Sequence, residues 1–365
     1  MNVNSKVVKI CFVAPKAYPL FNPDVKGVFG GAEVDLFLLA TELAKDDAFE
    51  VSFITADYGQ DKFENIQGVR VIKSLALEKN PLSGTIKIWR AMKNADARIY
   101  FQETASEGTF LVGLFCRLHK RKFVYRTAHK NECDGTYLKK YFWVGKAFRW
   151  SLHQAAQNIV QNETDKENIH RTTGVDSIAI KNAHHLPILS DTQRDIVLWV
   201  GRSAEFKRPQ LFLDLAEQIT DEKFTFICPR ATNDQNYEQL VARAEKIKNL
   251  NFIPHVDFAK IDDYFQRAKL FLCTSTGEGF PNTYVQACKN GAPILSLRVN
   301  PDNFLNENDC GICADGDWDR FVNEFTTLIK SERLQQLGKN ARKYAEDKHD
   351  IKKIVQVYKK LFLNL

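Results

Sequence analysis

The chain has 365 residues, more than the roughly 250–300 residues that one hydrophobic core usually serves, so we expect two domains. A hydrophobic content of 44%, with 12% aromatic residues, excludes a largely disordered protein. No apolar run reaches the roughly 18 residues that a membrane-spanning helix needs. The net charge of +6 is uneven, because residues 120–149 carry a balance of +7 and residues 339–365 a balance of +5. Such concentrations indicate an anionic partner surface.

The cysteines bear on the compartment and on metal binding. Most of the eight lie within apolar segments, which is typical of a reducing compartment. Cys310 and Cys313 form one C-x-x-C pair without a second pair, so we interpret them as core or loop residues and expect no metal site. The short apolar run Val7–Val13 predicts a first strand and not a signal peptide. We therefore expect a cytoplasmic protein.

Short β-type runs alternate with helical patterns along the chain. The first series of expected strands is Val7–Ala14, Val51–Thr55, Val69–Lys73, Arg98–Gln102, Phe123–Arg126, Asn158–Gln161 and Ser177–Lys181. The second series, after a polar segment at residues 184–194, is Ile196–Val200, Phe224–Cys228, Phe252–Pro254, Leu270–Thr274 and Ile294–Leu297. The clearest helices are Ala32–Lys45, Leu138–Gln154 and, near the end, Asp350–Leu363.

This alternation, with largely apolar strands, predicts parallel sheets that are covered by helices on both faces. Two such series predict an α/β protein with two doubly wound, Rossmann-like domains that face each other across a cleft. We place the first domain at residues 1–186, the second at residues 187–349, and a C-terminal helix at residues 350–365. Ligands of such sheets bind beyond the carboxyl ends of the strands, so the turns at those ends are the candidate sites.

The strongest signal is the turn after the strand Leu270–Thr274, which leads through Glu278 into a helix. Pro281 suits the first helical turn, where its missing N–H is no loss. The backbone N–H groups of Asn282 and Thr283 then point beyond the strand end, and together with the helix dipole they favour a phosphate group. The alternative is an ordinary strand–helix turn with a surface glutamate.

A second turn follows the strand Ile196–Val200 and contains Gly201, Arg202 and Lys207. Arg202 can donate two parallel hydrogen bonds to a phosphate, and Lys207 supplies a compact positive charge. No neighbouring pattern of opposite charges explains either residue as half of a surface ion pair. This turn alone would be interpreted as a solvated basic loop. Together the two turns predict a site for a nucleoside diphosphate at one sheet edge.

A glycine pair, Gly30 and Gly31, opens the first helix of the first domain. It is not part of a G-x-G-x-x-G motif, so binding of NAD is disfavoured. The pair permits a tight turn, and it also lets the backbone approach a ligand or phosphate closely.

In these residues the chain resembles the retaining GT-B glycosyltransferases of family 4. The glycine pair, the Arg–Lys turn and the glutamate turn occur in that family's order and spacing over nearly the whole chain. The resemblance implies that Arg202 and Lys207 hold the donor's diphosphate and that Glu278 contacts the transferred sugar. It implies a donor site made of Gly201, Arg202, Lys207, Glu278, Gly279, Phe280, Pro281, Asn282, Thr283 and Gln286. It also implies that the C-terminal helix crosses back onto the first domain.

The sequence departs from the family's E-x7-E signature at Gln286, which stands eight residues after Glu278. Glutamine keeps an acceptor oxygen for a ribose hydroxyl but loses the negative charge. The nearby segment Ser296–Asp302 resembles a subgroup that is involved in bacterial surface-polysaccharide assembly.

In the first domain, His129 stands where the family often has a histidine near the transferred sugar. An ordinary loop histidine is the alternative. Glu132 and Asp134 follow in the same loop as candidate contacts to an acceptor.

The activity implied by the resemblance is transfer of a hexose-type sugar, with retention of configuration, from a UDP- or GDP-linked donor to a glycan or a polyprenyl-diphosphate-linked acceptor. The residues that would take part in catalysis are Glu278, His129, Arg202 and Lys207. No obligatory metal and no cofactor beyond the nucleotide sugar are expected. A GT-B-type sugar-nucleotide epimerase and a catalytically silent nucleotide-sugar-binding subunit are the alternatives. No recognised module for nucleic acid accompanies the basic segments, so we expect no nucleic-acid partner.

The helix expected at Leu138–Gln154 has two unlike faces. One is an apolar stripe suited to a core, formed by Tyr141, Val144, Phe148 and Leu152. The other places Trp143 and Trp150 among basic residues, which is typical of an interfacial membrane face. We therefore expect peripheral association with the anionic inner face of the cytoplasmic membrane. The alternative is that both tryptophans pack inside the protein.

Overall fold

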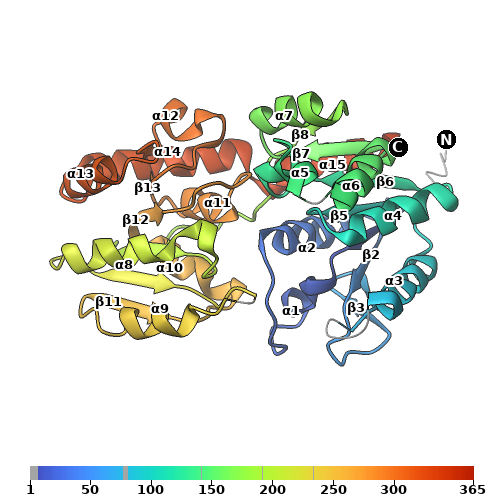
Figure 1. Ribbon diagram of the computed structural model, residues 1–365, viewed down its shortest axis with the longest axis horizontal. Coiled ribbons are helices and arrows are strands. Elements are labelled where there is room, and N and C mark those ends of the chain that lie inside the picture. The colour runs from blue at the N-terminus through green and yellow to red at the C-terminus, as the bar shows by residue number, and fades with distance from the viewer. Residues whose placement is uncertain (1–6, 77–80, 141, 191, 233) are drawn as a thin grey trace. The chain divides into compact units, whose positions relative to one another are not determined.

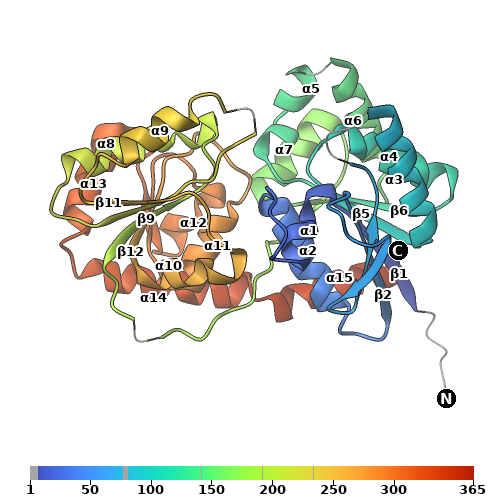
Figure 2. The ribbon, with the colours of Figure 1, turned by 90° about the horizontal axis from the view of Figure 1, so that it is seen from below.

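The structure is a computed structural model, and it describes residues 7–365 except residues 77–80, 141, 191 and 233. The chain divides into two compact units. Unit 1 consists of Met1–His184 and Ile351–Leu365, and unit 2 consists of His185–Asp350. Figure 1 and Figure 2 show that each unit is a twisted sheet with helices on both faces. All eight cysteines, including Cys310 and Cys313, are buried and unpaired.

Unit 1 is built on an eight-stranded sheet with the strand order β3-β4-β2-β1-β5-β6-β7-β8. Its strands are β1 (Val8–Val13), β2 (Phe49–Thr55), β3 (Phe63–Ile66), β4 (Val69–Lys73), β5 (Ile99–Glu103), β6 (Lys122–Arg126), β7 (Gln157–Val160) and β8 (Ile178–Ala179). Its helices are α1 (Tyr18–Phe21), α2 (Gly31–Leu43), α3 (Pro81–Ala95), α4 (Glu107–Leu118), α5 (Thr136–Lys140), α6 (Phe142–Gln154), α7 (Glu163–Thr173) and α15 (Ile351–Asn364).

Alternate residues of the strands in unit 1 serve two different cores, because successive side chains of a strand point to opposite faces. Cys11 and Val13 of β1 belong to a core that also contains buried residues of α3, α4 and α6. Phe12, between them, stacks against Phe53 and lies 5.4 Å, ring centroid to ring centroid, from Phe101 on the other face. Helices α2 and α15 cover that second face, and both are fully part of unit 1.

The C-terminal helix α15 is joined to unit 1 by apolar and polar contacts. Its buried residues recur with helical spacing as Ile351, Val355, Tyr358 and Phe362. The rings of Tyr358 and Phe362 lie against Phe101 of β5, and Lys359 forms an ion pair of 2.6 Å with Asp46. The expected return of the C-terminal helix to the first domain is therefore confirmed.

Unit 2 is built on a six-stranded sheet with the strand order β11-β10-β9-β12-β13-β14. Its strands are β9 (Ile196–Val200), β10 (Phe224–Ile227), β11 (Leu250–Ile253), β12 (Ala268–Cys273), β13 (Ile294–Ser296) and β14 (Gly311–Cys313). Its helices are α8 (Pro209–Gln218), α9 (Tyr237–Ala244), α10 (Ile261–Arg267), α11 (Asn282–Lys289), α12 (Phe304–Glu307), α13 (Trp318–Leu328) and α14 (Arg333–Lys348). Leu198 faces the core of α10, α11 and α14, whereas Val197 and Trp199 face the core of α8, α9 and α13.

The prediction of parallel, doubly wound sheets is confirmed. Among the described strands every neighbouring pair is parallel except β3 and β4, which form an antiparallel pair at one edge. The strands β3 and β14 were not predicted, because both are short and the residues of β3 are exposed or half-buried at an edge of the sheet.

The prediction of one helix over Leu138–Gln154 is wrong. Two helices, α5 and α6, lie on either side of Tyr141, which is outside the described residues. A Cβ placed on Gly145 would lie 2.5 Å from the carbonyl oxygen of Leu138, so α6 packs closely against α5. Glycine at this position permits that approach.

Candidate active site

The turn after β9 presents Arg202 at the carboxyl edge of the sheet in unit 2. Gly201 follows β9 directly, and a Cβ there would lie 2.9 Å from the Lys207 side chain and 3.0 Å from the Trp199 ring. Glycine is therefore required for the turn to close against these side chains. Arg202 is half-buried, and no carboxylate among the described residues forms an ion pair with it. Its guanidinium is available to an anionic ligand.

The same turn ends in a strained residue that starts α8. Arg208 has φ 49°, in the left-handed region that residues other than glycine rarely occupy. It serves as the N-cap of α8, whose first residue is Pro209. Backbone strain of this kind persists where the surrounding structure holds it, often at functional turns.

Lys207 and Glu278 form an ion pair that joins the two predicted turns. The Lys207 Nζ to Glu278 Oε1 distance is 2.7 Å, and the two side chains are only 17% and 12% exposed. Ser275 Oγ donates to the same carboxylate oxygen at 3.0 Å. No neighbouring pattern of opposite charges in the sequence predicted this ion pair. The partner lies 71 positions away along the chain, where charge patterns of neighbouring residues do not reveal it.

Backbone hydrogen bonds also join these two turns. Thr276 N–H donates to the Phe206 carbonyl oxygen at 2.8 Å, and Thr274 Oγ1 donates to the Lys207 carbonyl oxygen at 2.6 Å. The indole N–H of Trp199 in turn donates to Thr274 Oγ1 at 3.0 Å. Because parallel strands β9 and β12 are neighbours, their carboxyl ends are held in a fixed mutual position.

The start of α11 supplies the remaining predicted donor-site residues. Pro281 is the N-cap, with φ −62° and ψ 129°, so the helix begins at Asn282 and not at the proline as expected. The Tyr284 N–H donates back to the Pro281 carbonyl oxygen at 2.9 Å, and the helix dipole adds partial positive charge at this end. Asn282 and Thr283 are half-buried, and Gln286, one turn later, is 7% exposed.

The Phe280 side chain faces away from this edge and into the core. Its ring lies 5.0 Å from Phe304 and 5.0 Å from His349, centroid to centroid, and it is 3% exposed. The Phe280 side chain is therefore not available to a ligand at this edge. Gly279 precedes it in the same turn.

In unit 1 the glycine pair begins α2. Gly31 is the first residue of the helix and Gly30 is its N-cap, and the Gly30 N–H donates to Glu33 Oε2 at 2.7 Å. This bond satisfies the N-cap backbone, while the first-turn N–H groups remain oriented along the helix axis.

His129 follows β6 at the carboxyl edge of the same sheet. Its Nδ1 accepts from the Asn131 N–H at 3.2 Å, so a neutral ring carries its proton on Nε2. Glu132 was expected to contact an acceptor, and this is wrong because it is 3% exposed. Tyr125 Oη donates to Glu132 Oε2 at 2.6 Å, and burial raises the pKa of Glu132 to about 7.

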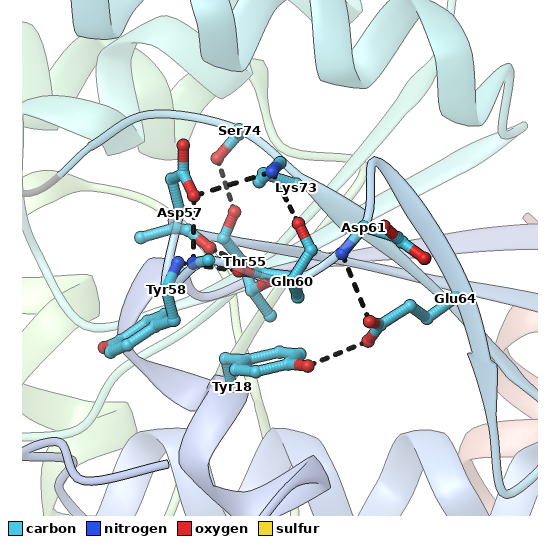
Figure 3. Close-up of polar contacts among 11 residues, drawn as sticks. Tyr18, Thr55, Asp57, Tyr58, Gln60, Asp61, Glu64, Lys73 and Ser74 are labelled. Atoms are coloured by element: carbon cyan, nitrogen blue, oxygen red, sulfur yellow. Dashed lines mark hydrogen bonds and ion pairs between the residues drawn. The ribbon is translucent and has the colours of Figure 1, made fainter.

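A polar cluster at the ends of β2 and β4 was missed by the sequence analysis. Figure 3 shows it, with Tyr18 Oη donating to Glu64 Oε2 at 2.9 Å and Lys73 lying 3.6 Å from Asp57. Tyr18 stacks on Tyr58 at 5.7 Å, centroid to centroid. A Cβ on Gly27 would lie 3.1 Å from the Tyr58 ring, so the loop before the glycine pair is held against this cluster.

A buried charged cluster was also missed. Arg126 is 2% exposed and donates to Asp35 at 2.8 Å, to Glu103 at 2.7 Å and to Asn182 at 2.7 Å. A small cavity of about 10 Å³, lined in part by these charged residues and Tyr358, adjoins it. Burial raises the pKa of Glu103 well above its usual range, although Arg126 opposes that shift. One indication of this cluster was present in the sequence, because Asp35 stands among apolar residues in α2.

Sequence comparison gives a family match for unit 2. Residues 181–344 match the family described as "Glycosyl transferases group 1". A relative, an uncharacterized glycosyltransferase from Haemophilus influenzae, is 21% identical over 217 residues, which are 57% of this chain and 59% of the relative. The chain thus aligns with about three fifths of the length of that relative.

Solved structures resemble the chain over nearly its full length. Sucrose-phosphate synthase from Thermosynechococcus elongatus has a TM-score of 0.78 and 16% identity, covering 98% of this chain and 99% of that one. WaaG, a glycosyltransferase involved in lipopolysaccharide biosynthesis, has a TM-score of 0.70 and 12% identity, covering 97% and 99%. The fold is GT-B.

The same GT-B fold is not restricted to one kind of enzyme among the similar structures. A putative UDP-N-acetylglucosamine 2-epimerase from Listeria monocytogenes has a TM-score of 0.63 and 13% identity, covering 96% of this chain and 94% of that one. Function must therefore be argued from the turns of the GT-B fold and not from the fold alone. Within the described residues, no group of three or more His, Cys, Asp or Glu side chains could hold a metal ion.

Proposed function

We propose that this protein is a glycosyltransferase that moves a hexose-type sugar from a UDP- or GDP-linked donor to a glycan or a polyprenyl-diphosphate-linked acceptor. We further propose retention of configuration and a role in bacterial polysaccharide or glycoconjugate assembly. The observation that carries this proposal is the pair of turns at the carboxyl edge of unit 2. There the Lys207–Glu278 ion pair, the available guanidinium of Arg202 and the start of α11 lie within a region that matches a glycosyltransferase family.

The donor's diphosphate is assigned to Arg202, Lys207 and the first-turn amides of α11. Arg202 can form two parallel hydrogen bonds to phosphate oxygens, and the helix N-terminus favours negative charge. Lys207 has three N–H donors, so it can keep its bond to Glu278 while donating to a phosphate. These groups stabilise the nucleoside diphosphate as it leaves, and one such fixed donor typically contributes about 2.7–4 kcal/mol to lowering the barrier.

Glu278 is assigned to the sugar and not to covalent catalysis. Lys207 and Ser275 already fix one of its carboxylate oxygens, which leaves the other to accept from a sugar hydroxyl. Gln286 is assigned to the ribose, as a neutral acceptor. Unit 1 would contribute the acceptor side, with Gly30, Gly31 and His129 at its own carboxyl edge.

Metal independence is part of the proposal. Positive charge near the diphosphate comes from Arg202, Lys207 and the start of α11, which together replace the charge that a divalent cation would bring. Turnover that is unchanged by EDTA would support this part, and a requirement for Mg²⁺ or Mn²⁺ would contradict it.

The deciding experiment measures hydrolysis of nucleotide sugars without acceptor, and then transfer to candidate acceptors, for the wild type and for Arg202→Ala and Glu278→Ala. Both variants are expected to lose at least a hundred-fold in turnover. If each stays within a few-fold of wild type, the assignment of the site is wrong.

The epimerase is the second candidate, because a structure of a putative epimerase shares the fold. An epimerase would convert the nucleotide sugar alone into an epimer, whereas a retaining transferase releases the original sugar slowly. A silent binding subunit would bind the donor and release neither. Product analysis by chromatography separates all three outcomes.

A further inference from the structure

Helices α4 and α6 present exposed aromatic and apolar side chains on one face of unit 1. Trp143 is 77% exposed and Phe142 is 61% exposed, at the beginning of α6. On α4, Leu118 is 63% exposed and Phe110 is 38% exposed. Large side chains of this kind on neighbouring helices indicate an interaction surface when they form a continuous patch.

Side-chain contacts within α6 and between α6 and α4 join most of these residues. Lys146 Nζ lies 4.1 Å from the centroid of the Phe142 ring and 5.2 Å from that of Trp143. Trp150, one helical turn after Lys146, lies 5.2 Å from Phe110 and 5.8 Å from the Arg117 guanidinium. The six residues that we call the α4–α6 face are Phe110, Arg117, Leu118, Phe142, Trp143 and Lys146.

The structure assigns different roles to the two tryptophans that the sequence analysis grouped together. Trp150 is half-buried, and its ring lies against α4 at Phe110 and near Gly113. Trp143 is 77% exposed, and its ring lies against the neighbouring, also exposed Phe142 ring at 5.2 Å, centroid to centroid. The two interpretations, membrane contact and internal packing, therefore apply to one tryptophan each.

Charge on this face has a single sign. Its charged residues, Arg117 and Lys146, are both basic, and α6 contains no aspartate or glutamate. The second basic segment, residues 339–365, does not add to it. Its first half lies on α14 in unit 2, and its second half lies on α15, which covers the opposite face of the sheet in unit 1. Only the second half of this segment therefore belongs to unit 1.

We propose that the α4–α6 face is a docking surface for an anionic lipid bilayer. Indole and phenyl rings favour the headgroup region, where one edge stays apolar and the other meets water. Lys146 and Arg117 would contact lipid phosphates beside these rings. The centres of protein interfaces are depleted in lysine, and here Lys146 stands between the exposed rings, so a lipid surface fits better than a protein partner.

Attachment of this kind is peripheral. No helix among the described residues combines the length and the hydrophobicity needed to cross a bilayer. Basic residues beside interfacial aromatics bind by burying rings and by attracting anionic lipid at the same time. Binding to the bilayer should therefore need both the aromatic rings and the basic side chains. It should weaken as salt screens the charge.

The test is co-sedimentation of the purified full chain with vesicles of phosphatidylcholine, with or without phosphatidylglycerol. Wild type is expected to sediment with the anionic vesicles and to be released by high salt. The double variant Phe142→Ser, Trp143→Ser should lower the partition coefficient about ten-fold or more, since both rings are lost from the interface. Lys146→Ala should lower it about five-fold.

Phe63→Ser is the matched control. Phe63 is an exposed aromatic residue, 40% exposed, with Lys62 and Arg70 at 5.2 Å and 4.7 Å from its ring, but it lies on β3 outside the α4–α6 face. The Phe63→Ser variant should bind to vesicles as strongly as wild type does. Thermal unfolding of each variant verifies that the fold is intact, and no substrate is needed, so the result does not depend on the proposed transfer reaction.

Three outcomes would overturn the proposal. The first is a wild type that does not bind anionic vesicles. The second is a double variant that binds as well as wild type. The third is an equal loss in Phe63→Ser, which would show that any exposed aromatic beside basic residues suffices. If wild type fails to bind and instead dimerises through Phe142 and Trp143, the face belongs to a second copy of the chain.

Discussion

Lys207 connects the two turns of the proposed donor site through its ion pair with Glu278. Its contribution to turnover can be tested by substitution. Lys207→Ala removes a positive charge aimed at the leaving diphosphate, so kcat is expected to fall about 100- to 1,000-fold. Initial rates of nucleotide-sugar hydrolysis measure this. Lys260→Ala is the control, because Lys260 forms an exposed ion pair with Asp257 in the same unit, with side chains 72% and 44% exposed. A variant at Lys207 that keeps kcat and loses only thermal stability would contradict the assignment.

Glu132 makes the stability of unit 1 depend on pH. Its pKa is about 7 in the folded chain because the carboxyl is buried, whereas an unfolded glutamate titrates near about 4.3. Between these values the folded state holds a proton that the unfolded state has lost, so stability falls as pH rises through this window. Glu132→Gln removes this effect.

The stability of wild type relative to Glu132→Gln should therefore decrease by about 2 kcal/mol between pH 5 and pH 7, at up to ~1.4 kcal/mol per pH unit. Urea unfolding gives the free energy of unfolding of both proteins at the two pH values. Subtracting the value of the variant from that of wild type at each pH cancels the contributions of the other titrating groups. A difference that is equal at both pH values would show that Glu132 is ionised in the folded chain.

The sequence placed most site residues near the correct strand ends but missed their partners. Arg202, Glu278 and the helix after Pro281 follow from local patterns, because turns at strand ends and helix starts depend on nearby residues. The Lys207–Glu278 ion pair and the Arg126–Glu103 bond span 71 and 23 positions. Such pairs depend on which strands become neighbours, and this information is not contained in a short stretch of sequence.

Helix α15 completes unit 1, because its apolar face covers residues that would otherwise be exposed. Phe362 is fully buried, with its ring 6.1 Å from Phe101, centroid to centroid. Phe362→Ala should lower the free energy of unfolding by about 3–5 kcal/mol through lost burial and a cavity. Leu363→Ala, at the next residue with 53% exposure, should change it by less than about 0.5 kcal/mol. Urea unfolding measures both, and equal effects would show that α15 does not pack as described.

Strands between clear polar turns were predicted better than the short strands β3 and β14. β9 and β4 have the predicted bounds, because both are largely apolar runs between polar turns. β3 and β14 have four and three residues, too few for a period to be recognised. α5 and α6 were merged because the helical pattern continues through Leu138–Gln154. The close approach at Gly145 that separates them is a tertiary contact.

The division of the chain into two units also divides its proposed chemistry. The carboxyl edge of unit 2 holds the basic turn, the ion pair and the start of α11, whereas unit 1 carries the polar clusters, His129 and the α4–α6 face. A nucleoside diphosphate without an acceptor should therefore bind to unit 2 alone, and its effects should be confined to that unit.

Ligand-induced stabilisation tests this division directly. A nucleoside diphosphate or nucleotide sugar at about 100 times its Kd adds about 2.7 kcal/mol to the unit that binds it. For a unit of this size the unfolding midpoint should rise by roughly 5–10 °C. Differential scanning fluorimetry with UDP-, GDP- and ADP-sugars should therefore show one base that shifts the transition, and hydrogen exchange should show protection at residues 201–208 and 275–286. Arg202→Ala should abolish the shift, and Lys260→Ala should keep it. Protection that appears mainly in unit 1 would place the nucleotide elsewhere and would remove the basis for the donor site.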